Sequence, residues 1–248
     1  DDQTSAITIF DLQQGNVAED TTVTLTEVLV SSPLTTEGDG FFVQDPAGGE
    51  YSGMYIYLQG SFSDLFLSVG DQLTLTGSYT EYYDFPEVTV TSETAIEVTG
   101  FDELPITEVA DVTDWEPYES VIVTLADQTV QDCTNQYGEV GLSEGIQMDD
   151  AFFSFDSSKG DVYESVSGAI AYSYGEFKLW PRDEADLAGK TPGEGCSSTI
   201  ASIQSEGVEG GVELSEVVVT SGLTYDGEGF FIQDAGGGEY AGIYVYTA

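Results

Sequence analysis

Short stretches of alternating polar and apolar residues follow one another along most of the chain. They are rich in β-branched and aromatic residues, and clusters of Gly and Asp separate them, which is typical of strands joined by turns. These stretches are residues 22–30, 53–58, 71–79, 87–92, 120–130 and 176–181. Helical signals are few: the three segments 7–14, 61–68 and 106–114 could form single turns or short helices. The pattern predicts an all-β protein with short helical insertions.

The order of the predicted elements indicates an architecture. In residues 1–100 a long strand is followed by "GFFVQD", "GMYIYL", the expected helix at 61–68, and a strand pair around the turn "TEYYDFP". Three strands, a helix and two strands is the order of the OB fold, a small Greek-key barrel. A second barrel is predicted over residues 101–190, with strands at "SVIVTL", "GIQMDD", "AFFSFD", "DVYESVSGAIAYSY" and "EFKLWP".

The chain also repeats itself. The stretch "GDGFFVQDPAGGEYSGMYIYL" at 38–58 returns as "GEGFFIQDAGGGEYAGIYVYT" at 227–247, at a constant offset of 189 residues (227 − 38). A period this long corresponds to a whole domain or domain pair. After a linker at 191–196, residues 197–248 therefore predict the first half of a third OB-like barrel, which repeats about residues 21–59.

A half barrel leaves its core open and its strand edges unpaired. Two explanations remain for this third unit. The chain is a fragment of a longer array, or strands or surfaces of a neighbouring molecule complete the half barrel. A head-to-tail contact of the second kind does not close on itself and produces a filament.

Two segments resemble known modules. The first is "GFFVQDPAGGEYSGMYIYL…VGDQLTLTGSYTEYYDFPEVTV", and the second is "WEPYESVIVTLADQTV…GIQMDD…VSGAIAYSYGEFKLWPRDEADL". The first is similar to the OB-fold modules of large secreted bacterial proteins, including those placed ahead of the catalytic domain in extracellular nucleases. The second is similar to the module that commonly follows. The resemblance implies an extracellular, multidomain context. It does not imply catalysis, because the His-dependent nuclease domain of such proteins has no counterpart here.

The chain is strongly acidic. It has 46 Asp and Glu residues against four Lys and Arg residues, a formal charge of −42, and 40% hydrophobic residues. The apolar content favours a folded protein over a disordered acidic tail. Nucleic-acid affinity depends largely on basic groups, so we expect no nucleic-acid partner. No stretch of eighteen apolar residues is present, so we also expect no membrane insertion.

The residue types that are missing limit the chemistry. The chain has no His and only two Cys residues, which excludes a Ser-His-Asp site, a Cys-His site and a thiolate zinc site. Cys133 and Cys196 are far apart and lack a CxxC context, so a disulfide is favoured over a metal or redox pair. A mature, secreted chain with extracellular or cell-surface localisation is the corresponding expectation.

Two acidic, Gly-rich loops are candidate cation sites. Hard cations such as Ca²⁺ require several oxygen ligands on a loop flexible enough to converge. The candidate ligands are Glu37, Asp39 and Asp45 in the first copy and Asp226, Glu228 and Asp234 in the second. The alternative is an ordinary strand connection, in which Gly supplies the backbone conformation and the acids are solvated.

Aromatic and basic residues give two candidate partner contacts. The hairpin "YTEYYDFP" places four rings, Tyr79, Tyr82, Tyr83 and Phe85, where they could stack on sugars or pack on a neighbouring protein; alternatively they cover the core and shield the sheet edge. Lys178 and Arg182 could contact an acidic neighbouring domain; alternatively they form local salt bridges with Glu176, Asp183 or Glu184.

Carboxylates are too numerous for any one pair to indicate a glycosidase, and small barrels rarely enclose the required cleft. We therefore predict a non-catalytic secreted structural or adhesive protein, a tandem β-barrel array that assembles head-to-tail through self-association or adjacent modules. The runner-up is an accessory binding segment of a larger secreted nuclease or polysaccharide-degrading enzyme. A third hypothesis is a monomeric module that binds Ca²⁺ or carbohydrate.

Overall fold

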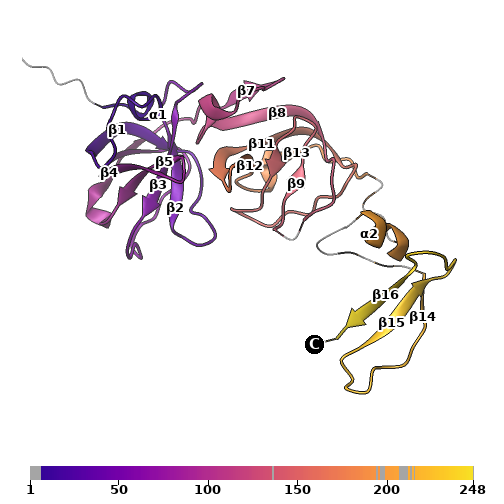
Figure 1. The fold of residues 1–248 in the computed structure, drawn as a ribbon. Coiled ribbons are helices and arrows are strands. Elements are labelled where there is room, and N and C mark those ends of the chain that lie inside the picture. Colours follow the sequence, from indigo (N-terminus) through magenta and orange to yellow (C-terminus); the bar gives the residue numbers. More distant parts are fainter. Residues whose placement is uncertain are drawn as a thin grey trace, which may run out of the picture.

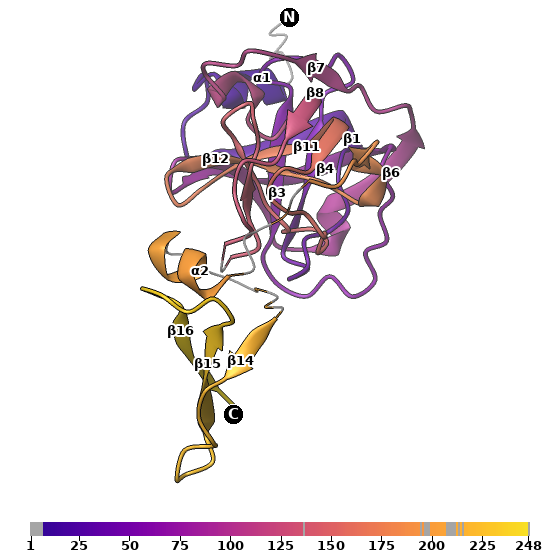
Figure 2. The ribbon, with the colours of Figure 1, turned by 90° about the vertical axis from the view of Figure 1, so that its right-hand side faces the viewer.

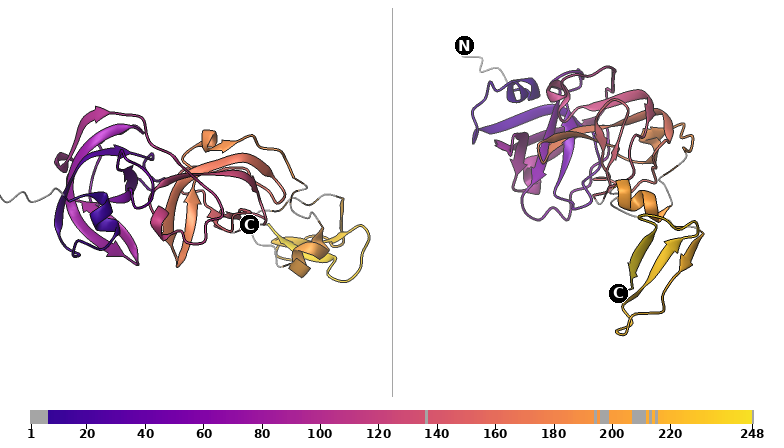
Figure 3. Two further views of the ribbon diagram at one scale, coloured as in Figure 1. Left: turned by 90° about the horizontal axis from the view of Figure 1, so that it is seen from above. Right: turned by 45° about the vertical axis from the view of Figure 1, so that its right-hand side comes forward.

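The computed structural model describes residues 7–135, 137–193, 195, 199–206, 212, 214 and 216–247. Three β-sheets follow one another along this part of the chain, with only short helices between strands, which confirms the all-β prediction. We refer to residues 7–101, 107–188 and 199–247 as the first, second and third units. The first two units lie side by side, and the third lies beyond the second (Figures 1 and 3).

The first unit is a closed ring of strands. Its elements are α1 (Ile9–Gln13), β1 (Thr22–Val30), β2 (Gly40–Gln44), β3 (Gly53–Leu58), β4 (Asp71–Tyr82), β5 (Phe85–Val90), the 3-10 helix η1 (Glu93–Ala95) and β6 (Ile96–Phe101). The strand order is β1-β2-β3-β5-β4, and β4 pairs back onto β1. A bulge between Leu25 and Val28 bends β1, because an extra residue on one strand increases its local twist. This bend lets β1 pair with both β2 and β4.

Alternation along the strands divides the side chains between two sets of contacts. Phe41 and Val43 point into the core of the ring, whereas Phe42 points outward to the second unit. Of the two alternatives predicted for 61–68, a single turn or a short helix, the structure has a turn and no helix. Phe62, Leu65 and Leu67 pack against the core, whereas Phe66 is exposed. The packed side chains are therefore not spaced as on one face of a helix.

The second unit has the same order of strand neighbours. Its elements are β7 (Thr107–Val109), η2 (Glu116–Tyr118), β8 (Ile122–Thr129), β9 (Val140–Gly141), β10 (Gln147–Met148), β11 (Val162–Ser173), β12 (Glu176–Trp180), η3 (Glu184–Asp186) and β13 (Leu187–Ala188). The order β8-β11-β12-β10-β9 is closed by a bridge between Val130 and Leu142. In both units the third and fifth strands of the ring are parallel.

Two sequence predictions in the second unit are wrong. Residues 106–114 do not form a helix, because β7 in this segment pairs with β8. Residues 151–156 are not a strand. There Phe152 packs toward the first unit and Phe155 packs into the core of the second, so the aromatic run serves two separate clusters instead of one strand.

The third unit contains α2 (Ile200–Glu206), β14 (Val217–Val219), β15 (Gly229–Asp234) and β16 (Gly242–Tyr246). The strands form an antiparallel sheet, and α2 packs against β15 and β16 (Figure 2). The repeat extends to the helix, because the Gln204 side chain donates to the Gly242 carbonyl as Gln13 does to that of Gly53. In the described part of the chain, no helix is long and apolar enough to cross a membrane.

Candidate functional site

The first and second units meet through a buried aromatic cluster. Phe42 is fully buried, and its ring centroid lies 6.1 Å from that of Phe152 and 5.8 Å from that of Trp180, both from the second unit. Ile122 and Ala169 are also fully buried in this cluster. Burial of apolar surface at about 25 cal/mol per Å² makes such a contact strongly favourable. The two units therefore form one packed body rather than two beads on a flexible linker.

Gln44 connects the first unit to the second, and to the segment that joins them, through its side-chain amide. Its Oε1 accepts a hydrogen bond from the Ile122 backbone N–H at 2.9 Å, and its Nε2 donates to the Pro105 carbonyl at 2.9 Å. Gln44 is fully buried, so both bonds lie where water cannot replace them. Nearby, the Tyr51 N–H donates to the Pro117 carbonyl at 2.6 Å. Sequence patterns alone did not identify Gln44, although a Gln kept in both copies of an apolar strand was a usable signal.

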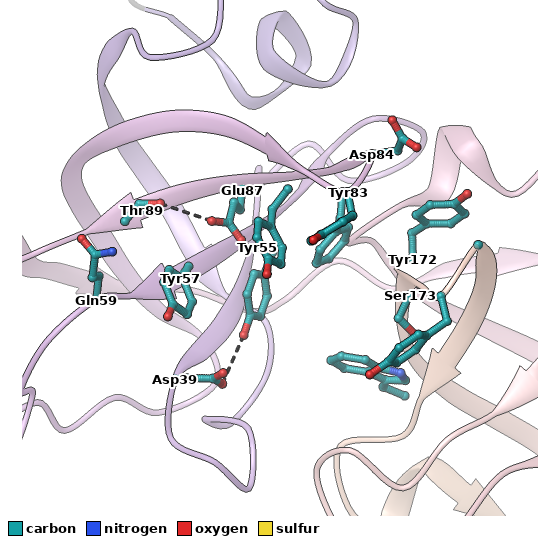
Figure 4. Close-up of a pocket in the computed structure, with 15 residues that line it drawn as sticks. Asp39, Tyr55, Tyr57, Gln59, Tyr83, Asp84, Glu87, Thr89, Tyr172 and Ser173 are labelled. Carbon is teal, nitrogen blue, oxygen red and sulfur yellow. Dashed lines mark hydrogen bonds between the residues drawn. The ribbon is translucent and has the colours of Figure 1, made fainter. Parts of the chain in front are cut away.

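A cleft of about 900 Å³ opens where the two units meet. Its walls come from β3, the β4–β5 hairpin, the β11–β12 hairpin and the loop before β2 (Figure 4). The lining is mostly aromatic and acidic: Asp39, Tyr55, Tyr57, Tyr82, Tyr83 and Glu87 come from the first unit, and Tyr172, Tyr174 and Trp180 from the second. Rings with hydroxyl groups and carboxylates suit a ligand that both stacks and donates hydrogen bonds.

Tight hairpin turns place tyrosines at the mouth of the cleft. Tyr83 and Asp84 both have positive φ, 51° and 65°, and so do Tyr174 and Gly175, at 53° and 87°. Two successive residues with positive φ form the type I′ turn, which matches the twist of paired strands. Tyr83 is 82% exposed and Tyr174 is fully exposed. These rings are therefore held on short, well-defined turns rather than on long loops.

The acidic groups of the cleft are partly withdrawn from water. Burial raises the pKa of Glu87, and the hydrogen bond that its carboxylate accepts from Thr89 at 3.2 Å opposes this shift, whereas the charge of Asp39 adds to it. Burial, together with the carboxylates of Asp39 and Glu87, also raises the pKa of Tyr55. The Tyr55 hydroxyl donates to Asp39 at 3.4 Å (Figure 4). The cleft thus offers hydrogen-bond acceptors and disfavours anions.

The four predicted aromatic contacts separate into two groups. Tyr82, Tyr83 and Phe85 line the cleft. Tyr79 does not, because it is 1% exposed in the core of the first unit, and its hydroxyl donates to Glu81 at 2.9 Å. Its assignment as a partner-binding residue is therefore wrong. The alternation of β4 turns its ring inward, which agrees with the alternative that these rings cover the core.

The two predicted basic contacts are local ion pairs with partners other than those proposed. Lys178 is buried and pairs with Glu139 and, at 3.4 Å, with Asp149. Burial alone would lower the pKa of Lys178, but these two carboxylates raise it overall. Arg182 pairs with Asp186 at 2.7 Å and also donates to the Ser31 carbonyl of the first unit at 3.4 Å. Arg182 therefore contributes to the contact between the units.

The six predicted cation ligands lie at corresponding positions near the two ends of β2 and β15, and several accept hydrogen bonds from the chain itself. Asp39 accepts from Thr35, Asp45 from the Ala47 N–H, and Asp226 from Thr224. Asp234 accepts from the first two backbone N–H groups of α2, at 2.9 and 3.0 Å. Glu37 and Glu228 are exposed. Within the described ranges, no group of three or more acidic, His or Cys side chains is placed to hold a metal ion, and Ca²⁺ binding remains a prediction.

The predicted disulfide joins Cys133 to Cys196. Cys196 lies outside the described residues. The pairing therefore remains a prediction.

Comparisons with known proteins give little further information. No family model and no curated protein matches the chain. Among solved structures, a murine DNA-binding protein bound to double-stranded DNA matches with 15% identity and a TM-score of 0.28, over 65% of this chain and 95% of the other. This finding contradicts the prediction that excluded nucleic acid as a partner, and that prediction no longer stands. A TM-score this low gives no support to DNA binding by this chain either.

Proposed function

We propose that this chain is a non-catalytic secreted structural or adhesive protein, built as an array of OB-like barrels that assembles head-to-tail. The observation that supports the proposal most strongly is the packed contact between the first and second units. It combines a buried aromatic cluster with the Gln44 bridge. An interface that is both apolar and bridged by buried hydrogen bonds fixes the angle between neighbours, as a stiff array requires.

The strand order supports the OB-like part of the proposal. In each of the first two units, the first ring strand pairs with the second and fourth, and the third is parallel to the fifth. A small ring with Greek-key order is what an OB barrel requires. The start of the same arrangement in the third unit supports a repeating series rather than a single pair.

Sedimentation velocity of the purified protein tests this function. An assembling array predicts species larger than one chain that increase with protein concentration. Parallel runs with added Ca²⁺ and with a chelator test whether acidic surfaces need a cation to approach one another. A single species of one chain at every concentration, with and without Ca²⁺, would contradict assembly.

A second candidate function is carbohydrate binding in the cleft, which corresponds to an accessory binding segment of a larger secreted enzyme. The observation that favours it is the row of exposed tyrosines beside the Asp39 and Glu87 carboxylates. Tyrosine rings can stack on the apolar faces of sugars, and carboxylates accept hydrogen bonds from sugar hydroxyls. Neutral oligosaccharides fit this lining better than anionic ones.

Calorimetric titration with cellohexaose and xylohexaose tests the second candidate. The substitution Tyr83→Ala should abolish binding because it removes an exposed ring from the cleft. Tyr137→Ala is the matched control, since Tyr137 is 69% exposed and is not among the cleft residues. Equal loss in both variants, or no binding by the unsubstituted chain, would refute this role for the cleft.

A further inference from the structure

The outer face of β15 and β16 carries the same residues that hold the first unit to the second. In the first unit, the contact uses Phe42, Gln44, Tyr51, Gly53 and Tyr55. At the offset of 189 residues, the third unit has Phe231, Gln233, Tyr240, Gly242 and Tyr244. All five residue types are identical. Among neighbours that do not make this contact, Phe41 and Asp45 are also identical in the second copy, whereas Val43, Pro46 and Met54 correspond to Ile232, Ala235 and Ile243.

The backbone of this face is also already in the contacting conformation. Strand β15 pairs with β16 in the register of β2 with β3, so that Phe231 lies opposite Tyr244 as Phe42 lies opposite Tyr55. Both ring pairs have centroids 5.1 Å apart and planes at 59°. The face therefore needs no rearrangement to make the same contacts.

The turn that presents a backbone donor is equally preserved. Tyr51 has φ of 60° and donates its N–H to the second unit, and Tyr240 has φ of 61°. A non-Gly residue in this left-handed region is uncommon and is strained where the surroundings do not compensate. Tyr240 adopts this conformation although its N–H has no hydrogen-bond acceptor among the described residues. The same conformation is thus kept where the partner is missing.

Exposure distinguishes the two copies. Phe42 is fully buried and Phe231 is 49% exposed, and Tyr55 is 8% exposed against 39% for Tyr244. Within the described part of the chain, the Gln233 amide has no hydrogen-bond partner, whereas that of Gln44 has two. Exposed aromatic patches with unused polar groups mark interaction surfaces.

We propose that this outer face is a docking surface for a β module built like the second unit, bound in the orientation that the second unit takes on the first. Such a module supplies a carbonyl for the Gln233 Nε2, an N–H for its Oε1 and a second carbonyl for the Tyr240 N–H. It also brings a backbone segment into direct contact with Gly242. At the matching Gly53 this approach is so close that an added Cβ would lie 2.1 Å from the Ser120 carbonyl. Few surfaces other than a second-unit module satisfy all of these conditions together.

This inference deepens the proposed array, on which it rests, by naming the module that each repeated face receives. Three chains test it by hydroxyl-radical footprinting: residues 1–248, the same chain followed by a copy of residues 60–100, and the chain followed by a copy of 60–190. The second chain supplies the strands that complete the third ring, and the third adds a second-unit module. Phe42 and Tyr55 in each molecule are internal references for buried rings.

We expect the oxidation rates of Phe231 and Tyr244 to fall to those of Phe42 and Tyr55 only in the longest chain. In that chain Gln233→Ala should restore oxidation, while in residues 1–248 it should change nothing. Equal oxidation of Phe231 in the two extended chains would overturn the proposal.

A second measurement does not depend on extended chains. In residues 1–248, Gly53→Ala should release the second unit from its own first unit, so that it binds the outer face of β15 and β16 in another molecule. Dimers that disappear in the Gly53→Ala/Gln233→Ala double variant support the docking surface, and a monomeric Gly53→Ala variant contradicts it. If footprinting or the Gly53→Ala variant shows docking, but the unsubstituted protein sediments as a single chain at every concentration, assembly is refuted and the docking surface is not. The two proposals can therefore fail separately.

Discussion

Glu119 is a buried acid whose protonation should control the stability of the contact between the units. It is 1% exposed, and neither carboxyl oxygen has a hydrogen-bond partner in the described residues. Burial, together with the charges of Glu116 and Glu81, raises its pKa from an ordinary value of 4.5 to about 9. Its backbone carbonyl lies 3.5 Å from the Gln13 amide of the first unit. The carboxyl is therefore neutral in the folded protein at pH 7.

The sign of the effect follows from this pKa. Below pH 4.5 the group is protonated in both the folded and the unfolded chain, and folding has no protonation cost. Between pH 4.5 and about 9, folding must take up a proton, so stability falls by about 1.4 kcal/mol for each pH unit. At pH 7 the cost to the free energy of unfolding is on the order of 3 kcal/mol. It is largest near pH 9.

The substitution Glu119→Gln removes this titration and keeps the shape of the neutral acid. We expect the variant to match the unsubstituted protein near pH 4.5 and to exceed its free energy of unfolding by about 3 kcal/mol at pH 7. Urea unfolding at pH 5, 6, 7 and 8, followed by tryptophan fluorescence, measures the difference. Glu97→Gln, at an exposed position, is the control for loss of one charge. A difference between the two proteins that does not change with pH would show that Glu119 is not neutral in the folded protein.

Of three further predictions, the first two compare matched positions in the two copies. In urea unfolding, Gln44→Ala should lower the free energy of unfolding by about 2–4 kcal/mol, because it leaves a buried N–H and a buried carbonyl unpaired. Gln233→Ala should have almost no effect in the same assay. Gly53→Ala should lower the melting temperature, since its Cβ would overlap the neighbouring unit; Gly242→Ala should not, because the nearest atom would lie at 3.7 Å. Lys178→Met should destabilise the second unit by about 3–5 kcal/mol, which denaturation followed by circular dichroism can measure.

Much of the fold could be predicted from local pattern, because strands were marked by period-two alternation and separated by Gly and Asp. The failures have a common cause. Residues 61–68 and 106–114 had some helical spacing, but three apolar residues of the first segment pack on a ring core and the second adds a strand to β8. Tertiary contacts overrode weak local propensity in both segments.

The site was predicted less well than the fold. The cleft combines hairpins from two units, and the sequence identified only the first, at Tyr82 and Tyr83. Lys178 pairs with Glu139, 39 residues away, and no short-range pattern reports such a partner. The role of Gln44 depends on backbone groups of Pro105 and Ile122, which carry no side-chain signature. Among the sequence signals, only the repeat indicated residues of the contact between the units, because all five contacting residue types recur in the second copy.

Electron microscopy of the isolated protein, with and without a calcium chelator, tests the array most directly. We expect regular fibres of residues 1–248. In the chain followed by a copy of residues 60–190, we expect the three-dimensional reconstruction to place the Phe231 and Gln233 face against the added second-unit module, in the geometry seen between the first two units. Loss of the fibres on chelation would place a cation at the contacts. Separate particles in both conditions would contradict the array, and an extended chain in which this face stays exposed to solvent would contradict the docking surface.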